Sequence, residues 1–214
     1  MIPILYQDRS ILVCVKPAGV LSQGAPGGEA DLLSLLSTQC GGEAYPVHRL
    51  DRGVGGVMVF ARTRQAAAAL SQAVQRGELV KEYLCVVSGA PEPAEGGYRD
   101  LLFHDSARNK TFVVRRMRKG VKEASLSYRV LGTAEGRSLV HVRLHTGRTH
   151  QIRVQFASRG MPLLGDRKYG GAPAEQIALW SCRLSFPHPD TGAALDFRQT
   201  PEGAVWQDFS NGSL

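Results

Sequence analysis

Short apolar runs rich in branched residues follow one another along the chain, and such runs predict buried strands. The clearest are residues 10–15, 56–61 and 79–87. Residues 138–145 alternate instead, which predicts a half-exposed strand. Leu139, His141, Arg143 and His145 lie on one side, and Val140, Val142 and Leu144 on the other. Weaker strand patterns occupy residues 111–114, 124–131, 177–186 and 194–198.

Helical periodicity is confined to a few segments, each preceded by a residue that can cap a helix. Asp31 is expected to cap a helix over residues 32–39, and Thr63 a second helix over residues 64–76. Thr149 is the expected cap of a third helix that ends near Ser158. Many strands with few helices predict an α+β fold and exclude a doubly wound parallel sheet.

Composition limits the class of protein and of partner. The chain has 214 residues, 43% of them hydrophobic, which is typical of a globular protein. It has no apolar stretch long enough to span a bilayer and its first residues lack the basic start of a signal peptide, so we expect a cytoplasmic protein. The net charge of +7 favours a polyanion partner, although a basic protein without a nucleic-acid role has the same charge.

Basic residues are concentrated between residues 107 and 129, where eight lysines and arginines face a single acid, Glu123. Strand patterns on both sides and Gly120 between them suggest an arm that contacts phosphates, which would position RNA without reading its sequence. A solvated basic hairpin is the alternative. The residues expected to contact RNA are Arg115, Arg116, Arg118 and Lys119.

One carboxylate stands out in a turn-rich segment, residues 45–53, that precedes a buried strand. Asp51 lies between Arg49 and Arg52, and neighbouring cations favour the ionised form of a carboxylate. The pattern alone fits either a structural ion pair or a catalytic group. His141, His145 and His150 are not joined by a cysteine or carboxylate at ligand spacing, so no metal site is expected.

Four segments in order give the chain a family resemblance. They are Lys16-Pro-Ala-Gly19, His48-Arg-Leu-Asp51, Lys81-Glu-Tyr-Leu84, and the run TGRTHQIRV at 146–154 with PLLGD at 162–166. Together they resemble the motifs of RluA-type pseudouridine synthases, from about residue 11 to residue 201. The resemblance implies one catalytic domain over residues 1–214, without a separate N-terminal RNA-binding domain. It also implies a long, mixed, mainly antiparallel sheet with flanking helices and a central RNA-binding cleft.

The resemblance assigns roles to particular residues. Asp51 would be the nucleophile, Tyr83 would pack on the flipped uracil and serve in proton transfer, and Arg153, with Arg148 as the alternative, would pair with Asp51. Arg49 would fill the space that the flipped base leaves. No cofactor is implied, and the expected partner of this monomer is structured RNA, either ribosomal or transfer RNA. The residues expected to contact that RNA also include His48, Arg52, Arg148 and His150.

One departure from the family leaves a second function open. After the aspartate the family commonly has Thr-Ser-Gly, whereas this chain has Val54-Gly55-Gly56. A catalytically silent RNA-binding protein of the same fold is therefore the alternative to an RNA-modifying isomerase. A glycosidase would require a second carboxylate opposite Asp51, and the motifs contain none. The sequence leaves open which RNA is modified, and whether Asp51 attacks the ribose or the base.

Overall fold

The computed structural model describes residues 1–24 and 29–209. The chain divides into two compact units. The first contains Met1–Lys81 and Trp180–Pro201, and the second contains Glu82–Leu179 and the segment that begins at Glu202. Within the described residues, no helix is long and apolar enough to cross a membrane.

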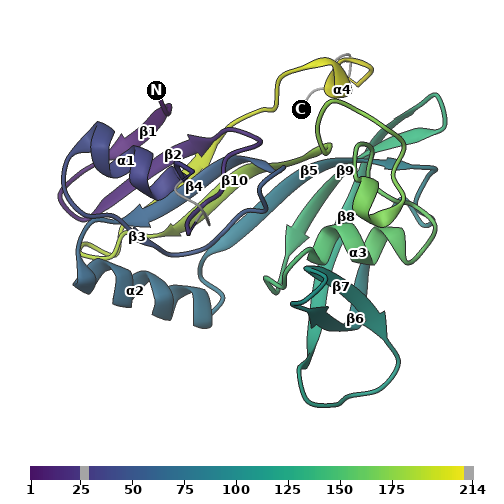
Figure 1. The fold of residues 1–214 in the computed structure, drawn as a ribbon, viewed down its shortest axis with the longest axis horizontal. Coiled ribbons are helices and arrows are strands. Elements are labelled where there is room, and N and C mark those ends of the chain that lie inside the picture. Colours follow the sequence, from purple (N-terminus) through teal and green to yellow (C-terminus); the bar gives the residue numbers. More distant parts are fainter. Residues whose placement is uncertain (25–28, 210–214) are drawn as a thin grey trace. The chain divides into compact units, whose positions relative to one another are not determined.

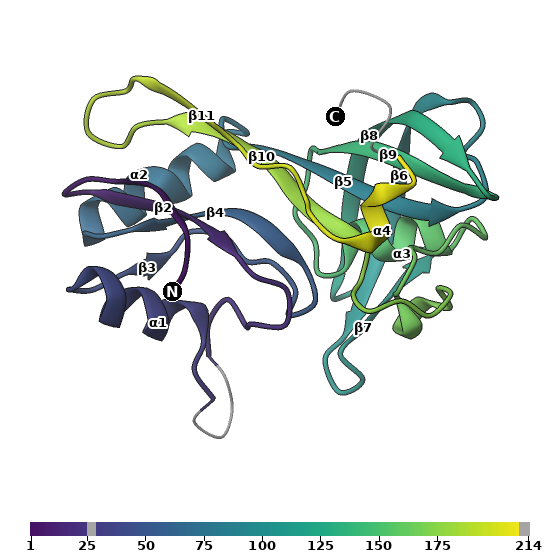
Figure 2. The same ribbon diagram turned by 90° about the horizontal axis from the view of Figure 1, so that it is seen from above.

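The first unit is a mixed sheet with a helix on each face. Its strands pair in the order β1-β2-β4-β10-β11, and the short strand β3 also pairs with β4. These pairs are antiparallel except β4 with β10, which is parallel. Figure 2 shows helices α1 and α2 on opposite sides of β2 and β4. The strands are β1 (Ile4–Gln7), β2 (Ile11–Lys16), β3 (Tyr45–Pro46), β4 (Gly55–Ala61), β10 (Leu179–Pro187) and β11 (Ala194–Arg198), and the helices are α1 (Leu32–Cys40) and α2 (Arg64–Gln75).

The helices of the first unit begin where the sequence predicted. The Asp31 carboxylate accepts a hydrogen bond from the amide of Ser34, and the Thr63 hydroxyl accepts one from the amide of Ala66. Helix α2 packs on the sheet through Ala66 and Leu70, which join Val57 and Val59 in one core. Every residue of β4 is buried, so the segment that follows Asp51 is anchored in that core.

The second unit is a five-stranded sheet with short helices. The strand order is β5-β9-β8-β6-β7, with α3 packed on the sheet where Val154 meets Leu102 and Ala124 (Figure 1). Its elements are β5 (Val80–Ser88), β6 (Glu95–Asp105), β7 (Lys110–Val114), β8 (Val121–Ala134), β9 (Arg137–Leu144), α3 (Gln151–Ala157), the 3-10 turn η2 (Arg167–Tyr169) and α4 (Ala204–Gln207). The mixed, mainly antiparallel α+β architecture predicted from the sequence is confirmed, whereas the single domain over 1–214 stays a prediction.

The strands around the basic segment are paired differently from what the sequence suggested. Strand β6, which begins at Glu95, was not among the strands predicted from the sequence. In the structure β6 lies between β7 and β8, so Phe103 has Phe112 as its partner on one side and Val121 on the other. Residues 115–120 therefore connect two strands that do not pair with each other, and they form the loop at the bottom of Figure 1.

The predicted start of the third helix was wrong. Thr149 does not cap α3, because His150 takes the N-cap position in a left-handed conformation (φ 54°), without a capping hydrogen bond from its side chain. The Gln151 side chain fixes the turn instead, since its Oε1 accepts hydrogen bonds from the Arg148 amide (3.0 Å) and the Thr146 hydroxyl (2.8 Å). Threonine at that position gave a plausible but incorrect signal.

Candidate active-site residues

The backbone beside Asp51 is held by a fully buried lysine. The ammonium group of Lys16 donates hydrogen bonds to the carbonyls of Pro17 (2.9 Å), Val20 (2.6 Å) and Arg52 (3.2 Å). All three ammonium donors therefore have an acceptor. Because Arg52 follows Asp51 directly, Lys16 fixes the position of the catalytic candidate's own loop.

Two further hydrogen bonds join Arg52 to Gly19. The Gly19 amide donates to the Arg52 carbonyl (2.8 Å), and the Arg52 Nε donates to the Gly19 carbonyl (2.9 Å). The Arg52 guanidinium also pairs with Glu29 at 3.0 Å. Arg52 was predicted to contact RNA, and these contacts give it a structural role in joining the two loops.

Electrostatics link Lys16 to Asp51. Burial lowers the pKa of Lys16 to about 8, and the negative charge of Asp51 opposes that shift. A buried ammonium group is stabilised by a nearby carboxylate. Lys16 thus contributes both hydrogen bonds and a positive charge beside Asp51.

His48 faces the interior of the first unit. Its Nε2 accepts a hydrogen bond from the Val59 amide (3.3 Å), and its Nδ1 is buried without a partner among the described residues. Burial, reinforced by the charge of Lys81, lowers the pKa of His48 to about 3. A neutral, half-buried imidazole whose Nδ1 faces the interior is a poor phosphate ligand, so this geometry favours attachment of the loop to β4 over the predicted RNA contact.

Arg153 has a buried acidic partner within the second unit. From α3, its Nε donates to Asp166 Oδ2 (2.7 Å) and its Nη2 to Asp166 Oδ1 (2.8 Å), and both side chains are buried. Its guanidinium carbon lies 5.2 Å from the centre of the Tyr169 ring. A bidentate pair fixes the plane of the guanidinium as well as its position.

A small network supports this pair. The Tyr169 hydroxyl accepts a hydrogen bond from the Thr111 amide (2.8 Å) and lies 3.0 Å from the Nδ1 of His150, which is buried. Sequence reasoning did not give roles to Asp166 and Tyr169. The signal was available for Asp166, because it ends the PLLGD segment that carried part of the resemblance.

The other predicted site residues of the second unit differ in exposure. Tyr83 is 5% exposed on β5. Arg148 is exposed, and its Nε donates to the Glu123 carbonyl (2.9 Å). The predicted roles of Tyr83, Arg148 and Arg153 toward Asp51 stay predictions.

Comparison with known proteins places the chain. Residues 10–158 match the model of a family described as RNA pseudouridylate synthase. The chain belongs to this family. An uncharacterized RNA pseudouridine synthase of Aquifex aeolicus is 36% identical over 94% of this chain and 70% of its own length. A ribosomal large subunit pseudouridine synthase D of Zymomonas mobilis is 32% identical over 91% of this chain and 67% of its own length.

Solved structures support the fold. Human RNA pseudouridylate synthase domain containing 4 has a TM-score of 0.76 at 24% identity, over 92% of this chain and 88% of that one. Human RNA pseudouridylate synthase domain containing 1 has a TM-score of 0.78 at 22% identity, over 94% and 84%. The fold is that of pseudouridine synthases, and the protein is an RNA pseudouridine synthase, an isomerase.

The departure of this pseudouridine synthase from the family's Thr-Ser-Gly run has a structural cause. A Cβ on Gly55 would lie 2.4 Å from the Trp180 ring, and one on Gly56 would lie 2.3 Å from the Ser181 carbonyl oxygen. Trp180 and Ser181 are the β10 residues that pair in parallel with these two glycines. The indole therefore occupies the space that a serine side chain at position 55 would need.

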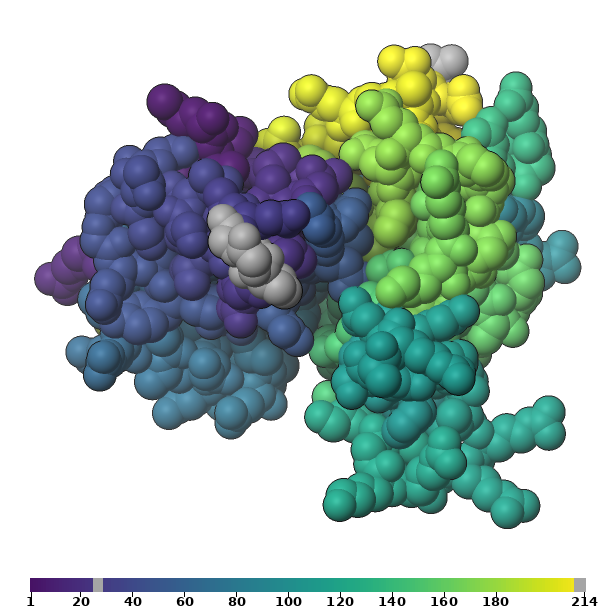
Figure 3. Space-filling view, in the orientation of Figure 1, coloured from purple at the N-terminus to yellow at the C-terminus, as the bar shows by residue number. Residues whose placement is uncertain are grey.

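Side chains that remain available for RNA are found in two places. Arg49 is exposed and makes no hydrogen bond or ion pair with the described residues. Residues 115–120 are all exposed, and the segment forms the teal-green projections at the bottom of Figure 3. Of its cations, Arg118 stacks over Phe103, with 5.0 Å between the guanidinium carbon and the ring centre.

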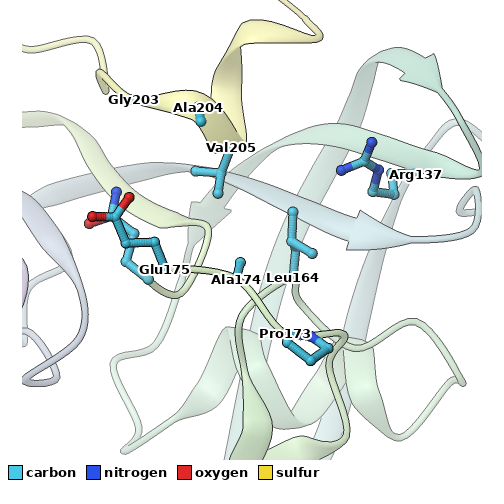
Figure 4. Close-up of a pocket in the computed structure, with 9 residues that line it drawn as sticks. Arg137, Leu164, Pro173, Ala174, Glu175, Gly203, Ala204 and Val205 are labelled. Carbon is cyan, nitrogen blue, oxygen red and sulfur yellow. The ribbon is translucent and has the colours of Figure 1, made fainter.

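Two cavities among the described residues are lined by side chains other than the predicted catalytic residues. One of about 300 Å³ in the second unit is lined by Arg137, Leu164 and Val205, among others (Figure 4). Another of about 450 Å³ in the first unit is lined by residues that include Tyr6, Asp8 and His188. Within residues 1–24 and 29–209, no cluster of three or more histidine, cysteine or acidic side chains is arranged to hold a metal ion.

Proposed function

We propose that this pseudouridine synthase isomerises uridines of large-subunit ribosomal RNA, with Asp51 as the attacking carboxylate. Relatives named ribosomal large subunit pseudouridine synthase D support ribosomal RNA over transfer RNA. The observation that carries the proposal is that Lys16 and Gly19 both donate hydrogen bonds to the Arg52 carbonyl. These bonds fix the backbone that carries the neighbouring carboxylate of Asp51. Action on RNA supports the cytoplasm as its location, and we assign it as a monomer.

The reaction requires no net transfer of electrons. The bond from uracil N1 to ribose C1′ breaks, a bond from C5 to C1′ forms, the C5 proton is lost and N1 gains a proton. Asp51 would attack either the ribose or the base as an ionised nucleophile. Arg153, oriented by Asp166, would stabilise that charge, and Tyr83 would pack on the uracil after it has been flipped out of its stack.

The rival function is RNA binding without catalysis. It rested on the replacement of Thr-Ser by Val54-Gly55. Trp180 supplies a local reason for that replacement, because it fills the volume next to Gly55. At position 55 the change is therefore one of packing, which weakens the argument for an inactive protein.

The test is tritium release from RNA that carries the label at uracil C5. The wild-type chain and Asp51→Asn are incubated in parallel with large-subunit ribosomal RNA transcripts and with total transfer RNA. Release by the wild type alone, from ribosomal RNA, is the expected result. Release from transfer RNA alone would reassign the substrate. Absence of release from both pools, with RNA binding retained, would support the rival function.

A further inference from the structure

The tip of the basic segment carries an exposed apolar side chain. We call residues 115–120 the arm. Met117 lies at its centre and is 58% exposed, the highest exposure of any described large hydrophobic residue after the N-terminal Met1. Single exposed hydrophobic residues are common on protein surfaces, so exposure alone has no meaning. The neighbours of Met117 make this case different.

The aromatic ring of Phe103 lies close to the arm, and the guanidinium of Arg118 covers its face. Phe103 on β6 has the guanidinium of Arg118 stacked over its ring at 5.0 Å. Burial of Met117 on that ring, with Arg118 in solvent, would satisfy the hydrophobic effect and the hydration of the charge together. The chain has the opposite arrangement, in which the arginine is packed and the methionine is exposed.

The base of the arm is fixed, so the exposure of Met117 is part of an ordered turn. The Val121 amide donates a hydrogen bond to the Arg118 carbonyl (3.0 Å). Gly120 has a positive φ of 84°, and a Cβ at that position would lie 3.4 Å from the Phe103 ring. Phe103 thus lies against the arm at Arg118 and at Gly120, on either side of Lys119.

The exposed cations around Met117 fit a partner that is a polyanion and also has apolar surfaces. Arg115, Arg116 and Lys119 are exposed and form no ion pair or hydrogen bond with the described residues. No acid occurs between residues 107 and 122. RNA offers phosphates to the cations and base faces to a side chain between them, and proteins use methionine among other apolar residues as a wedge between bases.

We propose that Met117 is an apolar wedge that contacts or separates stacked bases of the RNA while the flanking cations hold its phosphates. The proposal rests on the proposed function, because it assumes an RNA substrate. The charge of the arm alone predicts contacts with phosphates, and the wedge adds a contact with bases. Such a wedge would help to unstack RNA near the uridine that must be flipped.

The experiment uses RNA stem-loops with 2-aminopurine at single loop positions, because this base becomes brighter when it is unstacked. Full-length wild type, Met117→Ala and Met117→Leu are titrated at several salt concentrations. We expect a fluorescence rise at one or more positions with the wild type, its loss with Met117→Ala, and its recovery with Met117→Leu. Loss of one base contact should weaken binding about fivefold.

Salt dependence separates the wedge from the cations. Met117→Ala should leave the slope of log affinity against log salt unchanged, because no phosphate contact is lost. Leu131→Ala, which truncates another exposed apolar side chain of the second unit, is the matched control and should change neither signal. Melting temperatures verify that the variants are folded.

The outcomes separate the two proposals. RNA binding and unstacking that persist unchanged in Met117→Ala would overturn the wedge and leave the proposed function intact. A wild type that binds none of the stem-loops and none of the ribosomal transcripts would overturn the proposed function, and the wedge with it. The same absence of RNA binding is the result expected if the arm binds an acidic protein in place of RNA.

Discussion

The loop that carries Asp51 and the arm are both rich in arginine, yet Arg52 of the loop is used differently from Arg115 and Arg116 of the arm. Arg52 donates to Gly19 and pairs with Glu29, and its carbonyl accepts from the buried Lys16. Arg115 and Arg116 have no such contacts among the described residues. The first region is attached to its own unit through Arg52, with Arg49 left exposed, whereas Arg115 and Arg116 of the second present their charge to solvent.

The difference separates two tasks, the positioning of a reacting carboxylate and the binding of RNA. A reacting carboxylate must be held within a fraction of an ångström of its target, which requires neighbours that do not move. A phosphate-binding arm gains from exposed cations, which exchange counterions for RNA. Basic residues near a candidate site therefore have to be sorted by their contacts before they are counted as RNA ligands.

The largest effect is expected where a buried charge loses its partner. Asp166→Asn should lower the free energy of unfolding by about 3–5 kcal/mol, because the buried guanidinium of Arg153 would lose its bidentate ion pair with Asp166. Urea denaturation provides the measurement. Asp196→Asn, which breaks a more exposed pair with Arg183, is the control and should cost about 1 kcal/mol or less. Equal costs for the two variants would contradict the importance of burial at Arg153.

The attachment of the Asp51 loop should depend on pH. The pKa of Lys16 is about 8 in the folded chain, against an ordinary value of 10.5, so the unfolded chain binds more protons between these values. Stability contributed by Lys16 therefore rises as pH increases from about 8 to 10.5 and is lost as pH falls through 8. Compared with Lys16→Met, the wild type should gain about 3 kcal/mol over that window.

This pH effect is read as the difference between the unfolding free energies of the two proteins at each pH. Titrating groups common to both proteins cancel in that difference. A difference that is flat, or that falls as pH rises, would show that Lys16 is not a buried ammonium group in the folded chain.

The packing next to Asp51 should resist a change toward the family's serine. Gly55→Ser should cost about 1–3 kcal/mol, because its Cβ would overlap the Trp180 ring. If steric overlap with the indole is the cause, Trp180→Ala in the same chain should restore the stability, and any activity, that Gly55→Ser loses. Gly132→Ser is the control, since a Cβ there has no neighbour closer than 3.9 Å. A stable Gly55→Ser protein would refute the explanation of the departure.

The arm should show the smallest effect on stability and a clear effect on binding. Arg115→Ala with Arg116→Ala should change unfolding by less than about 0.5 kcal/mol, as expected for exposed residues. The slope of log affinity against log salt should become shallower by about 2 if each arginine neutralises one phosphate. Arg9→Ala with Arg198→Ala removes the same charge from the first unit and should leave the slope near its wild-type value.

Local features of the fold were predictable from the sequence, and long-range ones were not. The caps at Asp31 and Thr63 were predicted because the capping bond spans three residues. Strand β6 was missed because Gly96, Gly97 and several charges interrupt its pattern, and its strand state depends on pairing with both β7 and β8.

The same limit applies to the site. Motif resemblance predicted roles for Asp51, Tyr83 and Arg153, which stay predictions, but it could not show which arginines make contacts within their own unit. Arg52 was assigned to RNA because its partner Gly19 is 33 residues away and invisible to local reasoning. The packing of Gly55 against Trp180 joins segments 125 positions apart, so the glycine was read as a loss and not as a compensated change.

The most direct test measures single-turnover tritium release and RNA affinity on one set of proteins. With saturating enzyme, Asp51→Asn should lose release and keep its affinity, whereas the Arg115→Ala, Arg116→Ala double variant should lose affinity and keep its rate once RNA is saturated. This double dissociation is what separate positioning and capture predict. Normal release by Asp51→Asn, or a reduced saturated rate in the arm variant with unchanged affinity, would contradict the account.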